Sequence, residues 1–141
     1  MELKVKSYNE LTKDELYEIL RARSEIFVVE QECAYQDLDG RDKDSLHLFY
    51  CDGGIKAYMR AFYREDGAVQ IGRVLTIKHG EGFGGRLLKE GIAAVEKKMN
   101  PDRIIVEAQT YAAGFYEREG FKICSGEFLE DGIPHVKMIR K

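Results

Sequence analysis

The spacing of apolar residues divides the chain into helical and extended segments. Residues 3–6 alternate and predict a short first strand. Thr12 and Glu15 then form a capping box, in which the threonine side chain accepts from a free backbone N–H and the glutamate reaches back. The residues that follow recur at helical spacing and predict a helix, with one polar member on its apolar face: Leu16, Ile19, Leu20, Arg23 and Phe27.

Three extended segments follow an acidic, loop-like stretch. Residues 46–51 end at a glycine turn over 52–54, and residues 55–64 end at a second turn over 65–67. Residues 68–77 form the third apolar segment. Because short glycine turns join neighbouring antiparallel strands, we expect an antiparallel meander.

In the second half of the chain, segments with helical spacing of apolar residues alternate with extended segments. An apolar stripe predicts a helix that ends at Asn100 and Pro101: Phe83, Leu87, Leu88, Ile92, Val95 and Met99. A buried strand over 103–109, a short helix over 112–119 and two strands over 121–128 and 135–139 complete the prediction, with a turn near Asp131 and Gly132.

The predicted order is β, α, βββ, α, β, α, ββ, which indicates a single α/β domain over residues 1–141. We expect a mixed, mostly antiparallel sheet of about seven strands flanked by helices. Crossover connections between parallel strands are right-handed, so the strands around residues 74 and 106 are predicted to lie parallel and adjacent.

Composition excludes several classes of function. The 141 residues suit one domain, and the net charge of −3 argues against general attraction to nucleic acid or to an anionic membrane. No apolar run reaches the roughly 20 residues of a membrane span, and the N-terminus lacks the apolar core of a signal peptide. Three widely spaced cysteines fit neither a disulfide framework nor a zinc site, so we expect a cytoplasmic protein without a metal.

The most informative segment joins the third strand of the meander to the long helix. It places four glycines within six residues: Gly80, Gly82, Gly84 and Gly85. Glycine lets the backbone turn tightly and approach a ligand closely. The helix that follows adds free N–H groups and the positive end of its dipole, so the segment predicts a site for a phosphate or pyrophosphate.

The same glycines match the dinucleotide fingerprint, but their context differs from it. A Rossmann site needs the motif after the first strand of a repeating βαβ series, whereas here it follows a meander. Asp102 lies at roughly the right offset, but before a strand and not after it. No Gly-Lys-Ser/Thr follows, which argues against a Walker-type nucleotide site.

The element order and the glycine turn resemble the GNAT superfamily of acetyl-CoA-dependent N-acetyltransferases. Gly82 and Gly84 occupy the signature glycines, His79 occupies the signature's first position, and residues 115–121 match its later Phe-Tyr and Gly-Phe element. Three further blocks, over 20–31, 33–42 and 130–135, are similar to the ElaA-like branch.

This resemblance implies a GNAT-like sheet splayed where acetyl-CoA enters, and acetyl transfer to a small-molecule or peptide amine by direct attack in a ternary complex. It assigns the pantetheine arm to Val74, Leu75 and Thr76. Around the pyrophosphate it assigns Gly80, Glu81, Gly82, Phe83, Gly84 and Gly85, while His79 either positions the loop or meets phosphate. Further along the chain it assigns Phe115 and Tyr116, and Gln109 is either a cofactor contact or a buried amide bonded to backbone. Arg86, Lys89 and Arg118 are either contacts for CoA phosphates or ordinary surface charges.

The resemblance also implies catalytic roles. A backbone N–H near Leu75 would stabilise the oxyanion, and Tyr116 would protonate the departing thiolate, because a phenol with a pKa of about 10 is protonated at neutral pH. The general base stays open among His47, Glu107 and His135, each of which has a structural alternative.

The acidic stretch over residues 30–44 is the expected acceptor-binding loop, with Glu30, Tyr35, Asp37 and Asp39 as candidates. Clustered carboxylates favour a cationic amine, and alternation places Asp37 and Asp39 on one side of an extended segment. A solvated polar loop is the alternative. A non-catalytic acyl-CoA sensor would share the same fold, and a homodimer formed through strand edges stays open.

Overall fold

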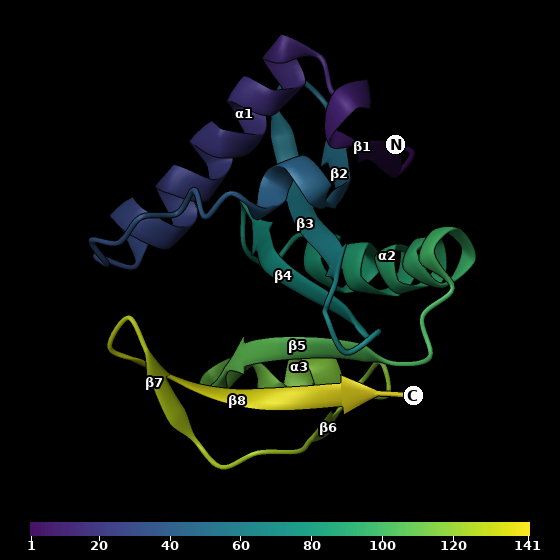
Figure 1. Ribbon diagram of the computed structural model, residues 1–141. Helices are drawn as coiled ribbons and strands as arrows, with labels where there is room; N and C mark the ends of the chain where they lie inside the picture. Colours follow the sequence, from purple (N-terminus) through teal and green to yellow (C-terminus); the bar gives the residue numbers. More distant parts are fainter.

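The molecule is built on a strongly twisted, eight-stranded sheet (Figure 1). The computed structural model describes all residues, Met1–Lys141. The strand order is β1-β2-β3-β4-β5-β8-β6, with β7 also paired to β8. The strands are β1 (Lys4–Ser7), β2 (Leu46–Cys51), β3 (Ile55–Tyr63), β4 (Val69–Thr76), β5 (Ile104–Gln109), β6 (Lys122–Ile123), β7 (Phe128–Glu130) and β8 (Ile133–Arg140). Only β4 and β5 pair in parallel, so the predicted mixed, mostly antiparallel sheet is confirmed.

Three α-helices accompany the sheet: α1 (Lys13–Arg23), α2 (Phe83–Met99) and α3 (Ala113–Glu117). The predicted capping box starts α1, since Glu15 N donates to Thr12 Oγ1 at 3.0 Å and Thr12 N donates to Glu15 Oε1 at 2.9 Å. A π-helix, Ser24–Glu30, continues α1 and was not predicted. Short 3₁₀ turns lie at Tyr8–Glu10, Arg41–Asp44 and Thr110–Ala112. No helix is both long and apolar enough to cross a membrane.

The helices cover the two faces of the sheet with separate apolar clusters. Leu87, Leu88, Ile92 and Val95 of α2 belong to the larger cluster, together with residues of β2, β3 and β5. On the other face Ile19 and Ala22 of α1 join Ile26, Phe49, Tyr58 and Leu75. The α2 helix lies very close to β3, because a Cβ added at Gly91 would be 2.5 Å from Met59 Sδ.

The parallel strands separate soon after they pair. Val69–Ile71 of β4 face Ile104–Val106 of β5, and both strands then continue without pairing to each other. The predicted parallel neighbours are therefore confirmed, with Ile71 and not Val74 opposite Val106. A bulge at Arg73, whose φ is 51°, also shifts the register between β3 and β4. These two irregularities open the sheet at the C-terminal half of β4.

Two predicted elements differ from the structure. The single strand predicted over residues 121–128 is wrong: it is divided into β6 and β7, which gives eight strands in place of about seven. The division follows from Ser125, whose Oγ accepts from Lys137 N at 2.9 Å in place of a ladder carbonyl. The predicted helix over 112–119 is shorter, since its start is the 3₁₀ turn and its α-helical part is α3.

Candidate active site

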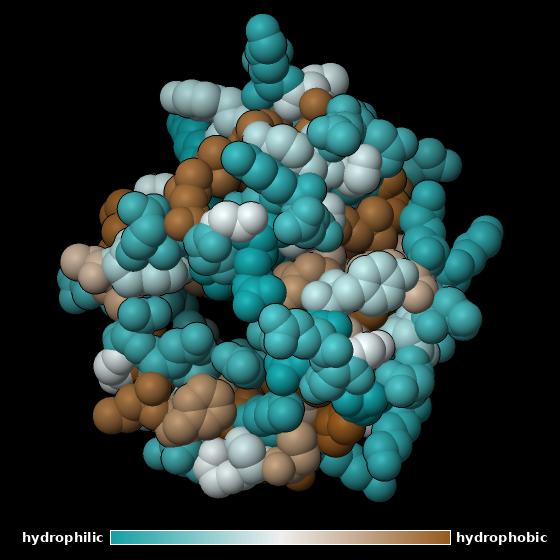
Figure 2. Space-filling model, viewed as in Figure 1, coloured by the Kyte–Doolittle hydropathy of each residue, from teal (hydrophilic) through white to brown (hydrophobic).

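A cavity with a volume of about 1230 Å³ lies between the diverging strands. Its walls come from β3 and β4 on one side and from β5, α3 and the β7–β8 turn on the other. The segment over residues 26–41 closes it at the α1 side. Figure 2 shows the hollow between the two halves of the molecule, surrounded largely by polar side chains.

The glycine turn lies at one end of this cavity, before α2. Gly80 and Gly82 have φ of 85° and 79°, a conformation that residues with a Cβ rarely adopt. The first backbone bond of the helix runs from Arg86 N to Gly82 O, so the N–H groups of residues 83–85 have no helical acceptor. A Cβ at Gly80, Gly82 or Gly85 would meet open space, whereas one at Gly84 would lie 3.4 Å from Thr76 Cγ2. The turn therefore presents bare, unpaired N–H groups, which fits an anion such as a pyrophosphate.

Tyr116 lines the cavity from α3 and is 7% exposed. Its ring makes edge contacts with Phe115 and Phe121, at centroid distances of 5.1 and 5.8 Å. Burial raises the pKa of the Tyr116 phenol above its ordinary value, and no hydrogen bond offsets that effect. The hydroxyl is thus protonated throughout the neutral range, as a proton donor must be.

A second group of titratable side chains lies on the β5–β8 wall. Gln109 is paired with His135 across the two strands, and Glu107 lies two residues before Gln109, on the same face. His135 Nδ1 lies 2.7 Å from the carbonyl oxygen of Ile133, so Nδ1–H donates there and Nε2 is left as the acceptor of the neutral ring.

Glu130 is the carboxylate nearest to this histidine. Its Oε2 lies 3.6 Å from His135 Nε2. Burial, and then the charge of Glu107, raises the pKa of Glu130 above its ordinary value. His135, Glu107 and Glu130 all line the cavity, so this wall contains three groups able to hold a proton.

His47 does not reach the cavity, which corrects its expected role as a base. It is 0% exposed, and both ring nitrogens have partners. Nε2–H donates to Asp42 O at 2.8 Å, and Nδ1 accepts from the Tyr58 hydroxyl at 2.7 Å. Burial lowers the pKa of His47, so this histidine is a neutral structural group.

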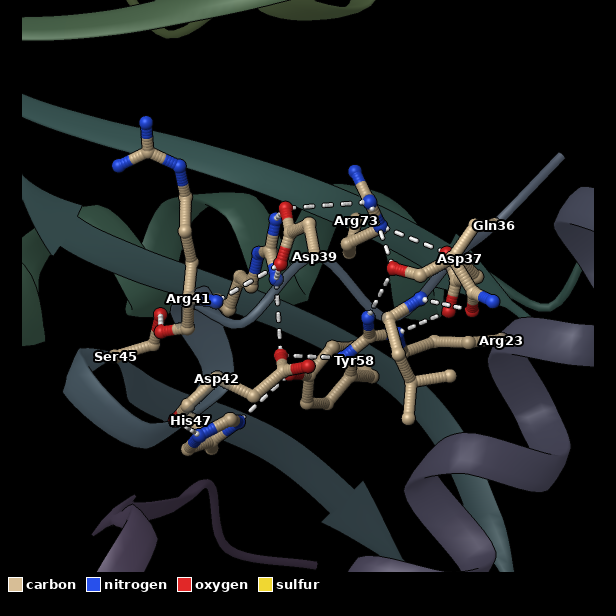
Figure 3. Close-up of polar contacts among 12 residues, drawn as sticks. Arg23, Gln36, Asp37, Asp39, Arg41, Asp42, Ser45, His47, Tyr58 and Arg73 are labelled. Carbon is tan, nitrogen blue, oxygen red and sulfur yellow. Dashed lines mark hydrogen bonds and ion pairs between the residues drawn. The ribbon is translucent and has the colours of Figure 1, made fainter.

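Three carboxylates of the acidic segment, Asp37, Asp39 and Asp42, are engaged by arginines (Figure 3), which corrects the expectation that Asp37 and Asp39 attract a cationic amine. Asp37 accepts from Arg23 Nε and from Arg73 Nε, each at 2.8 Å. Asp42 accepts from Arg23 Nη1 at 2.6 Å and from Arg60 Nη1 at 3.0 Å.

Asp39 completes this network, which we call the arginine–aspartate cluster: Arg23, Arg60, Arg73, Asp37, Asp39 and Asp42. Burial alone would raise the pKa of Asp39, but hydrogen bonds from Arg60 hold it well below its ordinary value. The formal charges in the cluster cancel. Asp37 and Asp39 therefore present no free negative charge to a cationic amine. Only Asp37 and Asp42 are buried between residues 37 and 44, so the rest of this stretch is exposed to solvent.

Comparisons with known proteins agree with this geometry. The profile of the acetyltransferase (GNAT) domain matches residues 7–141. The chain belongs to the GNAT acetyltransferase family.

Proteins similar to this GNAT domain occur in both a yeast and bacteria. A UPF0039 protein of Schizosaccharomyces pombe is 36% identical over 143 residues, covering 98% of this chain and 95% of that protein. The crystal structure of ElaA from Escherichia coli has 32% identity and a TM-score of 0.93, and an acyl-CoA N-acyltransferase from Pseudomonas aeruginosa has 37% identity and a TM-score of 0.92; each covers 100% of both chains. The chain is therefore an N-acetyltransferase of the ElaA-like branch, in a family that uses acyl-CoA and acts on amines.

In this GNAT domain the acidic segment also crosses the open end of the cleft. The amides of Gln31 and Gln109 donate to each other, at 3.2 and 3.4 Å. Cys33 Sγ lies 3.6 Å from Asp131 O, and Glu30 Oε1 lies 2.9 Å from His79 Nε2. These contacts join the α1 side of the molecule to β5, to the β7–β8 turn and to the glycine turn.

The structure also shows the positions of several side chains whose roles the sequence left open or did not indicate. Arg86 contacts Glu90 and stacks on Tyr50 at the surface of α2 and does not line the cavity. The Tyr35 hydroxyl donates to Asp37 Oδ1 at 2.5 Å. Arg23, Arg60 and Arg73 were not proposed as site residues. Their sequence signal is an arginine at a position where the periodicity requires an apolar residue.

Proposed function

We propose that this protein transfers an acetyl group from acetyl-CoA to a primary amine within a ternary complex. The observation that carries the proposal is the parting of β4 from β5 beside a glycine turn with unpaired N–H groups. Beyond Ile71 the backbone of β4 that faces β5 has no strand partner, so Val74, Leu75 and Thr76 are free to bond a pantetheine arm. Phe83, Gly84 and Gly85 would hold the pyrophosphate through their N–H groups.

The titratable groups of the cavity supply the proton transfers. The amine nitrogen forms a bond to the thioester carbonyl carbon, the carbon–sulfur bond breaks, and the sulfur leaves with the electron pair. His135 Nε2, with Glu107 and Glu130 beside it, takes the proton that the amine must lose. Tyr116 gives its hydroxyl proton to the leaving sulfur, and a backbone N–H near Leu75 stabilises the developing oxyanion.

The test is the release of CoA thiol from acetyl-CoA in the presence of polyamines, amino sugars, amino acids and lysine peptides. Tyr116→Phe should lower kcat by roughly a hundredfold to ten-thousandfold, because general acid catalysis contributes of that order, with little change in the affinity for acetyl-CoA. Unchanged turnover in Tyr116→Phe would remove the tyrosine from the mechanism. Binding of acetyl-CoA with no transfer to any amine would favour the alternative, an acyl-CoA sensor. Three free cysteines support a reducing, cytoplasmic setting for either function.

A further inference from the structure

The wall of the cavity formed by β3, β4 and the turn after Gly40 contains donors that the arginine–aspartate cluster does not use. Arg60 is 3% exposed and lines the cavity, yet its Nε has no hydrogen-bond partner. Arg73 engages Asp37 and Asp39 through Nε and Nη2 only. Arg41 forms no ion pair; its guanidinium lies over the Phe62 ring, 4.6 Å from the centroid.

These donors gather on one side of the cluster. Figure 3 shows the guanidinium groups of Arg41 and Arg73 on either side of Asp39, with their free ends directed to the same side. A buried N–H without an acceptor is costly, so the orphan Nε of Arg60 points to a missing partner that can accept hydrogen bonds. A planar guanidinium can donate two parallel hydrogen bonds to a carboxylate, so a carboxylate on the acceptor would supply such a partner.

Arg41 is well separated from the glycine turn. Phe62, beside Arg41, pairs with Gln70, whereas Thr76 lies beside the turn at the other end of β4. Six residues of strand between Gln70 and Thr76 correspond to roughly 20 Å. An anion near Arg41 is therefore a different group from the pyrophosphate.

The opposite wall has the opposite character. Glu107 and Glu130, with Asp131 next to them, line it and form no ion pair with an arginine or a lysine. Both Glu107 and Arg73 act on Glu130 through their charges, so the two walls lie within electrostatic reach of each other. An ammonium group is attracted to this carboxylate wall, where His135 is ready to take its proton.

We infer that the acceptor carries a carboxylate in addition to its amine: the amine lies against Glu107, Glu130 and His135, and the carboxylate binds Arg41 and Arg73, next to Arg60. This inference rests on the proposed function and names its substrate class. Two sources supply this chemistry, a free amino acid and a peptide with its terminal carboxylate, and the experiment separates them.

The experiment compares amines that differ only in the carboxylate. CoA-thiol release is measured with lysine against cadaverine, with phenylalanine against phenethylamine, and with a lysine tripeptide as free acid against its amide. The carboxylated member should have a kcat/KM at least about tenfold higher, since a charge-assisted hydrogen bond is worth that much or more. A preference confined to the tripeptide pair identifies the peptide source; one confined to the amino acids identifies the free acid. Equal use within every pair would overturn the inference.

Arg41→Gln tests the named donor without disturbing the buried cluster, because Arg41 is exposed. It should raise KM several-fold for the carboxylated member and leave KM for the decarboxylated member unchanged. Lys43→Gln is the matched control: it removes a cation from the same turn that does not line the cavity, and it should change neither. A higher KM for acetyl-CoA in Arg41→Gln would assign the arginine to CoA and overturn the inference.

A binding measurement separates this inference from the proposed function. Thermal unfolding is followed in the presence of CoA with added lysine or cadaverine. Stabilisation by lysine alone, weakened in Arg41→Gln, supports the carboxylate site even if no amine is acetylated, in which case only the proposed transfer fails. Equal stabilisation by both amines, or by neither, contradicts the carboxylate site even if transfer occurs.

Discussion

Replacing Asp37 by asparagine tests how much the arginine–aspartate cluster contributes to the stability of the fold. Asp37 is 6% exposed, and its two carboxylate oxygens accept from Arg23, Arg73 and Tyr35. Asparagine has nearly the same shape but replaces one of these oxygens by an N–H₂ group, which faces a donor. The substitution also leaves one positive charge in the cluster unbalanced.

The magnitude follows from the burial of the partner. Arg23 has a side chain that is 0% exposed, so its charge cannot turn to water when Asp37 is neutralised. Removing one partner of a buried ion pair costs about 3–5 kcal/mol. Arg23 keeps its contact to Asp42, which places the expected loss at the lower end, about 3 kcal/mol. A domain of this kind has a total stability of about 5–15 kcal/mol, so the effect is large.

The assay is urea unfolding of the parent and of Asp37→Asn at neutral pH. The midpoint should fall while the m-value stays the same, because the surface exposed on unfolding does not change. Asp44→Asn is the control: Asp44 lies in the same segment, is exposed and forms no ion pair, so its effect should stay within about 0.5 kcal/mol. A loss below about 1 kcal/mol in Asp37→Asn would refute the reasoning, since it would mean that water or a rearrangement replaces the buried partner.

Two further predictions concern regions away from the cleft. Hydrogen bonds from Lys6, Thr12 and Lys4 outweigh the effect of burial and lower the pKa of Glu15 to about 2. The stability that these bonds provide is present above the ordinary pKa of this carboxyl and is lost as the pH falls toward 2. Urea unfolding as a function of pH should therefore show that Glu15→Gln loses part of this acid dependence, and an unchanged dependence would contradict the prediction. In Gly91→Ala the new Cβ would lie 2.5 Å from Sδ of the fully buried Met59; overpacking costs about 1–3 kcal/mol and the better helix propensity of alanine offsets about 1 kcal/mol, so we expect a net destabilisation of about 1 kcal/mol. A melting temperature equal to or above that of the parent would show that Met59 moves aside at little cost.

The parts of the fold that local patterns determine were predicted well from the sequence. The apolar segment bounded by a glycine turn gave β2 over Leu46–Cys51, and the capping box gave the start of α1. The turn at Asp131 and Gly132 is also confirmed, with positive φ at both residues. In each case the signal lies within a few residues, so no knowledge of distant contacts is needed.

The parts that failed depend on contacts between distant residues. The division between β6 and β7 arises because Ser125 bonds Lys137, and the sequence around Ser125 does not indicate that partner. The π-helix after α1 likewise continues an apolar spacing that is compatible with an ordinary α-helix. The roles expected for Asp37, Asp39 and His47 were inferred from residue type and local spacing, whereas the partners that neutralise them include residues of β3 and β4.

The acidic segment shows why a cluster of carboxylates must be compared with buried arginines before it is assigned to a ligand. Arg23 stands on the apolar face of α1, and Arg60 lies in a strand whose neighbours are buried; an arginine in either place needs a carboxylate partner from elsewhere in the chain. Asp37, Asp39 and Asp42 of the acidic segment are these partners. The carboxylates that attract an amine are therefore Glu107 and Glu130, on the opposite wall, and not those of the acidic segment. The acidic segment contains Arg41, and its Asp37 and Asp39 hold Arg73 in place. Asp37 and Asp39, which were expected to attract a cation, therefore help to position the arginines that select an anion.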